Sequence, residues 1–123
     1  VAGYPDRVTE TDGYILKPGE RHLFSTGIKL NIPAGYAIIF KDRSGNANNK
    51  GLHVLGGVID SSYIGELKVV LLNTSDKEVT IVNNDRIAQM VVVPDYDSQF
   101  IQIEPDQLNK TDRGEKGFGS SGN

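Results

Sequence analysis

The stretch Glu66-Leu67-Lys68-Val69-Val70-Leu71-Leu72 is the strongest indication of the fold of this chain. It begins as an alternation of polar and apolar residues and then becomes continuously apolar. Such a run is typical of a β-strand that enters a hydrophobic core, because successive side chains of a strand point to opposite faces.

Further short apolar runs lie on both sides of this strand, separated by turn residues. Pro18-Gly19, Pro33-Ala34-Gly35 and Asn83-Asn84-Asp85 have the composition of tight turns. Strands this short and this closely spaced predict an all-β sandwich or barrel, with at most a single helical turn at residues 105–108. The predicted strands are residues 21–32, 36–41, 52–55, 66–73, 78–82, 86–93 and 99–103.

Size and composition limit the class of protein. The 123 residues have room for one domain, and its small core makes oligomerisation a reasonable expectation. A net charge of −3 argues against binding nucleic acid through bulk attraction to phosphates. The chain has no cysteine, and it has no apolar run of the roughly 18 residues that a membrane span needs. We therefore expect a soluble, intracellular protein that binds neither nucleic acid nor membrane.

The last eleven residues, RGEKGFGSSGN at 113–123, differ from the rest of the chain. Glycine and serine dominate, which is typical of a flexible segment. An arginine, a phenylalanine and two hydroxyls among these glycines could also fold over a phosphorylated, aromatic ligand. We expect a core domain at residues 1–112 and a flexible C-terminal arm at residues 113–123.

Arg43-Ser44-Gly45 follows the apolar run at residues 36–40. A cation, a hydroxyl and an open backbone N–H at a strand end suit phosphate oxygens. An ordinary polar turn has the same composition, so the motif by itself leaves both interpretations open.

The segment from Gly56 to Gly65 contains two consecutive glycines and an aspartate. Paired glycines let a ligand or another backbone approach closely. Asp60 follows two β-branched residues, so its carboxylate is expected at the edge of a packed hairpin, where it could accept a proton from water. Tyr63 is either a core residue or a ring presented to a sugar.

Arg86-Ile87-Ala88-Gln89 is the third motif. In a strand, Ile87 and Gln89 would share one face, and a glutamine among apolar residues needs a backbone group or a ligand as partner. No catalytic Ser/His/Asp set and no common glycine-rich nucleotide loop occurs. His22 and His53 are expected to be isolated, partly exposed strand residues.

Taken in order, these motifs resemble the trimeric dUTPase family. The resemblance covers the chain from about Leu16 onward, and it implies a distorted jelly roll or β-barrel. It also implies hydrolysis of dUTP to dUMP and pyrophosphate, which limits uracil incorporation into DNA and supplies dUMP for dTMP synthesis. The matching motifs are Arg43-Ser44-Gly45, Gly57-Val58-Ile59-Asp60 with Tyr63 and Gly65, Arg86-Ile87-Ala88-Gln89, and the glycine-rich arm from Arg113 to Gly122.

The resemblance implies a role for each motif. Asp60 would be the general base that orients the water attacking the α-phosphorus, and Tyr63 would pack under the deoxyribose and exclude a ribose 2′-hydroxyl. The hairpin backbone from about Leu55 to Tyr63 would read the uracil edge. Its substrate-binding residues are Leu55, Gly57, Val58 and Ile59.

The phosphates would be held by other parts of the chain. Ser44, Gly45 and Gln89 would contact them, and Arg43 would brace the site through a carboxylate. In the arm, Phe118 would cover the uracil. The other arm residues implied to contact substrate are Arg113, Gly117, Gly119, Ser120 and Ser121.

In this family each active site is assembled from three chains of a homotrimer: the hairpin of one, the phosphate motifs of a second and the arm of a third. Mg²⁺ is held by the triphosphate and by water, so no direct protein ligand of the metal is expected.

The sequence departs from the family near its start, where Ala2-Gly3-Tyr4-Pro5-Asp6-Arg7 stands for a motif of the form Ala-Gly-x-Asp-Leu. Lys41-Asp42 before Arg43 is also unusual. The related dCTP deaminase is disfavoured because its catalytic glutamate corresponds to Val70 here. A binding or regulatory protein that keeps the fold without catalysis remains an alternative, and so does a purely structural jelly roll.

Overall fold

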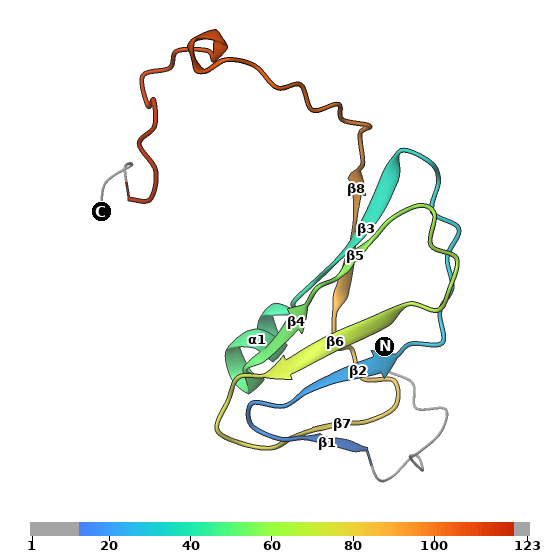
Figure 1. The fold of residues 1–123 in the computed structure, drawn as a ribbon. Coiled ribbons are helices and arrows are strands. Elements are labelled where there is room, and N and C mark those ends of the chain that lie inside the picture. Colours follow the sequence, from blue (N-terminus) through green and yellow to red (C-terminus); the bar gives the residue numbers. More distant parts are fainter. Residues whose placement is uncertain (1–12, 120–123) are drawn as a thin grey trace.

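The computed structural model describes residues 13–119 (Figure 1). Most regular structure in this range is β-strand, so the predicted all-β class is confirmed. The elements are β1 (Tyr14–Leu16), β2 (Arg21–Ser25), β3 (Tyr36–Lys41), α1 (Ser44–Lys50), β4 (Leu52–Leu55), β5 (Val58–Ile59), β6 (Lys68–Asn73), β7 (Val79–Ile81), β8 (Gln89–Pro94) and the 3₁₀ turn η1 (Pro105–Gln107).

The strands form three small antiparallel sheets. Their strand orders are β1-β7, β2-β6-β4 and β5-β3-β8. Within residues 13–119 no pairing joins these sheets into a closed barrel, so the jelly-roll alternative describes the fold better than a barrel does.

The core lies between the sheets, and β6 contributes to it at alternate positions. Val69 and Leu71 are fully buried, whereas Val70 and Leu72 are half-buried. Phe24 on β2 and Phe40 on β3 pack into the same cluster, together with Ile87 from the segment before β8. Burying apolar side chains on one face of each strand is what a period-two pattern achieves.

Asn73 is the one buried polar side chain among the described residues, and it is fully satisfied. Its Nδ2 donates to Leu16 O (2.9 Å) and Lys77 O (2.7 Å). Its Oδ1 accepts from the backbone N–H of Ser75 (2.9 Å) and from the Ser75 hydroxyl (2.7 Å). One amide therefore ties the end of β6 to β1 and to the turn that leads into β7.

The predicted turns are confirmed. Glu20 N–H donates to Lys17 O across Pro18-Gly19, and Tyr36 N–H donates to Pro33 O before β3. In the third turn Asn84 adopts a left-handed φ of 70°, a conformation that asparagine tolerates better than most residues.

Several predicted strand boundaries were wrong. The strand from residue 21 ends at Ser25, because the Thr26 hydroxyl bonds Leu67 O and Gly27 turns the chain at a φ of 74°. Residues 86–88 precede β8 instead of belonging to it, and residues 99–103 form no strand. The short strands β1 and β5 were not predicted.

Helix α1 was also missed, because its sequence SGNANNK has no apolar stripe and buries no residue. It ends at Gly51, which is left-handed (φ 67°) and whose N–H bonds Ala47 O, as helix-terminating glycines commonly do. Asn46 Nδ2 donates to Arg86 O (2.8 Å), which links the helix to the segment before β8.

After β8 the chain leaves the body of the molecule (Figure 1). The bond from Asp95 N–H to Gly35 O is at the point of departure. All residues from 96 to 119 are exposed, including Phe100 at 98%. The predicted helical turn is present there as η1.

Replacing Asn73 with alanine is expected to lower the free energy of unfolding by about 2–4 kcal/mol, because the buried bond to Leu16 O is lost together with the packing of a fully buried side chain. Urea unfolding at a fixed protein concentration measures this. The control is Asn48→Ala on exposed α1, expected to change stability by less than about 0.5 kcal/mol. Equal stability of the two variants would contradict the role of Asn73.

Candidate active site

A polar pocket lies where β3 ends. Its lining residues are Arg43, Ser44, Gly45, Asn46 and Gln89. Arg43 caps α1 in an extended conformation (φ −86°, ψ 130°), and no side chain caps the first N–H groups of the helix. These groups have no acceptor inside the helix. The pocket therefore gathers a guanidinium, a hydroxyl, two amides and open backbone N–H groups, a set of donors that suits phosphate oxygens.

Four of these five residues were proposed from sequence, and the structure brings them together. Asn46 was missed, and its only sequence signal is its place directly after the Arg-Ser-Gly motif. Arg43 makes no ion pair with a carboxylate in residues 13–119, so its expected bracing partner is not found in that part of the chain.

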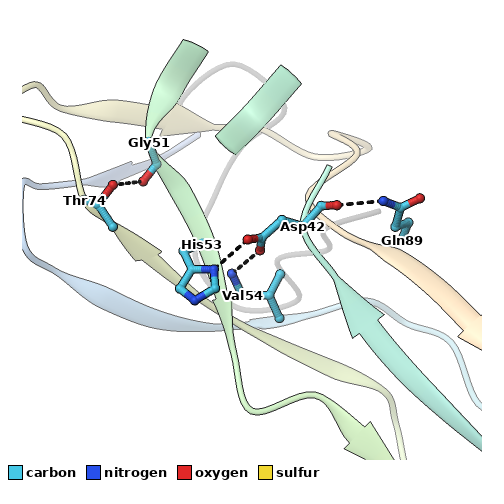
Figure 2. A network of polar contacts seen from close by, with 6 residues as sticks. All are labelled: Asp42, Gly51, His53, Val54, Thr74 and Gln89. Atoms are coloured by element: carbon cyan, nitrogen blue, oxygen red, sulfur yellow. Dashed lines mark hydrogen bonds and ion pairs between the residues drawn. The ribbon is translucent and has the colours of Figure 1, made fainter. Parts of the chain in front are cut away.

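Gln89 begins β8 and lies opposite Lys41, so it sits at the same end of β3 as Arg43. Its Nε2 donates to the backbone oxygen of Asp42 (2.7 Å; Figure 2). The predicted sharing of a face with Ile87 was wrong, because Ile87 lies outside the strand and is buried while Gln89 is exposed. Gln89 thus satisfies a backbone group and still has a second amide hydrogen to donate.

The chain bends tightly between β4 and β5, and Gly57 is the reason. β4 pairs with β6 and β5 pairs with β3, so the predicted hairpin is not a pair of bonded strands, and we call the bend at residues 55–63 the hairpin. The φ of Gly57 is 106°, a conformation that L side chains rarely adopt. A Cβ at this position would lie 3.1 Å from Phe40 Cβ and 3.2 Å from Phe40 O. Phe40 N–H donates to Gly57 O (2.8 Å), so this glycine lets the backbone of β3 approach closely.

Asp60 directly follows β5 and is exposed, and it lies beside β3, with which β5 pairs. Its Oδ1 accepts from the Ser62 hydroxyl and from the Ser62 backbone N–H (2.8 Å). These two bonds hold the pKa of Asp60 below its ordinary value. Asp60 is therefore ionised at neutral pH, and its exposed carboxylate can accept a hydrogen bond from water.

Tyr63 is held with its ring partly exposed. Its hydroxyl donates to Glu66 O (2.6 Å), and its ring covers Gly65, where a Cβ would come within 2.7 Å of the Tyr63 hydroxyl. The side chain is 42% exposed, so Tyr63 is not a core residue. A fixed, open ring of this kind can pack against a flat ligand group.

The hairpin and the pocket lie at opposite ends of β3. Ile38 pairs with Ile59, which places Asp60 opposite the start of β3, whereas Gln89 and Arg43 lie at or beyond its end. Asp60 lies at the level of Ala37, so four residues separate it from Gln89 and six from Arg43, a distance along the backbone of roughly 13 to 20 Å. Asp60 and the pocket of one chain therefore lie at different ends of the strand.

The described part of the arm stands apart from both groups. Arg113 Nε donates to Lys116 O (2.6 Å), and the Phe118 side chain is fully exposed. Gly119 adopts a left-handed φ of 81°. A Cβ added at Gly117 would have no neighbouring atom within 4 Å. Ser120 and Ser121 lie outside the described residues, as does Asp6 of the diverged first motif.

The electrostatics of the pocket favour an anion over a metal ion. The residues that line it supply hydrogen-bond donors and one positive charge. In residues 13–119 no group of three or more His, Cys, Asp or Glu side chains could hold a metal ion. None of the helices described could cross a membrane.

Comparisons with known proteins agree with this fold. The dUTPase family model matches residues 2–122. The deoxyuridine 5'-triphosphate nucleotidohydrolase of Hydrogenobaculum is 47% identical over 90% of this chain and 77% of its own length. That of Bdellovibrio bacteriovorus is 40% identical over 98% of this chain and 81% of its own length.

Solved structures give the same result. The Staphylococcus bacteriophage 80alpha dUTPase with dUPNHPP superposes with a TM-score of 0.77 at 28% identity, covering 98% of this chain and 92% of that one. Fold, site and relatives together define a hydrolase. The chain belongs to the dUTPase family.

Replacing Ser62 with alanine is expected to raise the pKa of Asp60 toward its ordinary value, because the largest stabilisation of the carboxylate would be lost. Because the folded pKa is depressed, the contribution of Asp60 to stability is present above the unfolded pKa and disappears as pH falls through the folded value. Carbon-13 NMR titration of the Asp60 carboxyl measures the shift. Ser61→Ala is the matched control, and an equal pKa in both variants would refute the assignment.

Proposed function

We propose that this chain hydrolyses dUTP to dUMP and pyrophosphate through a water molecule that Asp60 orients toward the α-phosphorus. The observation that carries the proposal is an ionised carboxylate of Asp60 that is exposed to water, in a chain of the dUTPase family. A carboxylate with a lowered pKa is a weak base, so its main contribution is to align the water and to stabilise its developing positive charge.

The hairpin provides base and sugar recognition. The backbone around Leu55, Gly57, Val58 and Ile59 reads the uracil edge, and the lack of room for a methyl group excludes thymine. Tyr63 packs against the deoxyribose and leaves no space for a 2′-hydroxyl. The support is that Gly57 packs against Phe40 and the Tyr63 hydroxyl is bonded to Glu66 O, so both are held in place before substrate binds.

The pocket binds phosphates. Ser44 and Gly45 contribute backbone N–H groups, Gln89 its second amide hydrogen, and Arg43 a positive charge. These donors neutralise charge as the pyrophosphate leaves. Mg²⁺ fits this arrangement as a companion of the triphosphate, since the pocket has donors for the phosphate oxygens that a metal leaves free. When bound, the metal supplies further neutralisation of the triphosphate.

Three copies of the chain complete each site. The proposal is supported by the separation of roughly 13 to 20 Å between Asp60 and the pocket along β3, which another copy would bridge. Met90, Val91 and Val92 on β8 are exposed apolar residues that a second copy could cover. The arm at residues 113–123 extends from the body and would close a neighbouring copy's site, with Phe118 over the uracil and Arg113 at the γ-phosphate end.

This reaction would keep dUTP low and supply dUMP, which limits uracil in DNA and feeds dTMP synthesis. A binding or regulatory protein without turnover is the alternative, and activity measurements separate the two.

Pyrophosphate release with Mg²⁺ is expected from dUTP and to be much slower from dCTP, dTTP and UTP. Asp60→Asn is expected to lower kcat by at least about a hundredfold, because an amide cannot stabilise a proton leaving water. Binding of the analogue dUpNHpp should persist in this variant. A folded wild-type protein that binds the analogue without releasing pyrophosphate would leave a binding protein in place of an enzyme.

A mixing experiment tests the shared site. Asp60→Asn disables the hairpin, and Ser44→Asp places a carboxylate in the pocket, so each variant alone is expected to be inactive. If the two lesions belong to different copies in each site, co-refolding equal amounts should leave about one quarter of sites intact. Activity near that fraction of wild type supports sharing, and no recovered activity in mixed trimers would contradict it. Asp60→Asn co-refolded with itself is the control.

A further inference from the structure

Asp42 and His53 form an ion pair beside the phosphate pocket, on residues to which neither the sequence motifs nor the proposed mechanism gives a role. The distance from His53 Nδ1 to Asp42 Oδ2 is 2.6 Å. The other carboxylate oxygen, Oδ1, accepts the backbone N–H of Val54 at 2.5 Å. Figure 2 shows both bonds reaching from the end of β3 across to β4.

Asp42 also holds Gln89. The backbone oxygen of Asp42 accepts a hydrogen bond from Gln89 Nε2 (2.7 Å), so Asp42 contacts β4 through its side chain and β8 through its main chain (Figure 2). The next three residues are Arg43, Ser44 and Gly45, which line the pocket together with Gln89. A movement of Asp42 would therefore move four of the five pocket residues.

The charge of Asp42 makes its pairing important. A carboxylate next to a site for a triphosphate would repel it if the carboxylate were turned toward the pocket. Both oxygens are instead engaged on the β4 side. Partial burial works to raise the pKa of Asp42, but the Val54 N–H, the bond and charge of His53 and the charge of Lys41 together lower it, so the group stays ionised and paired.

β4 gives this anchor a firm base. Leu52 and Val54, on either side of His53, are buried, and β4 pairs with the central strand β6 along its whole length. The Thr74 hydroxyl and N–H both bond Gly51 O at the start of β4. His53 itself projects outward, with its side chain 55% exposed, so it can be changed without opening the core.

We propose that Asp42 and His53 are positioning residues that hold the Arg43–Gly45 segment and Gln89 in the geometry that binds the phosphates of the substrate. This inference rests on the proposed dUTP hydrolysis. It adds the two residues that keep the phosphate pocket in its binding geometry. Neither residue touches the reacting atoms. Their effect should appear in binding of the triphosphate and should not extend to the nucleoside.

The test uses two variants of His53 with nearly the same shape. In His53→Asn the amide nitrogen lies near the position of Nδ1 and keeps a donor for Asp42, whereas His53→Leu has no donor. His53→Leu is expected to raise KM for dUTP and Kd for dUpNHpp about three- to tenfold, and kcat should change less. His53→Asn should stay near wild type, and deoxyuridine should bind equally to all three proteins.

A second pair of variants shows whether His53 acts through Asp42. Asp42→Ala should weaken dUpNHpp binding at least as much as His53→Leu, and adding His53→Leu to Asp42→Ala should have no further effect. Melting temperature is measured in parallel, because Asp42→Ala also removes the acceptor of Val54 N–H. Asp76→Asn on an exposed turn is the control for loss of a carboxylate.

The possible outcomes separate this inference from the proposed function. If the wild type releases pyrophosphate from dUTP and His53→Leu binds dUpNHpp as tightly as the wild type does, only the positioning role is overturned. Equal weakening of deoxyuridine binding, or fully additive effects in the double variant, would overturn it as well. If the wild type neither turns over dUTP nor binds dUpNHpp, both proposals fail.

Discussion

Backbone pairing of β3 with two neighbours is the constraint from which the organisation of the site follows. β3 lies between β5 and β8, and the register of both pairs is fixed by hydrogen bonds along the strands. The pairing with β5 places Asp60 at one end of β3, and the pairing with β8 places Gln89 at the other. A slip by one residue would turn the buried side chains of β3 outward, so the core itself enforces this register.

The two ends of β3 are built differently. At the hairpin end, Gly57 lets the chain turn tightly against Phe40, and Ser62 keeps Asp60 charged. At the pocket end, the chain passes through Asp42 into a short helix whose first N–H groups face solvent. The first end suits a water nucleophile and a nucleoside, whereas the second suits phosphates, and this division agrees with the proposed sharing of each site between copies.

Stability and function are connected through the ends of the central strands. Asn73 closes β6 with four hydrogen bonds, and β6 in turn supports β4, from which Val54 and His53 hold Asp42. The order of the phosphate pocket therefore derives from the core through two strands and one carboxylate. An exposed pocket at a chain turn would otherwise lose much of its binding free energy to the entropy of ordering.

The sequence by itself determined the all-β class, the central strand at residues 66–73, the turns and the candidate residues, because these depend on local periodicity and on motifs read in order. It did not predict α1, whose SGNANNK sequence has no amphipathic pattern and which is held by contacts such as Asn46 with Arg86. Nor did it reveal that Asp42 and His53, eleven residues apart, form a pair. Only the tertiary structure decided these points, since packing between elements of different sheets brings together residues that no local pattern connects.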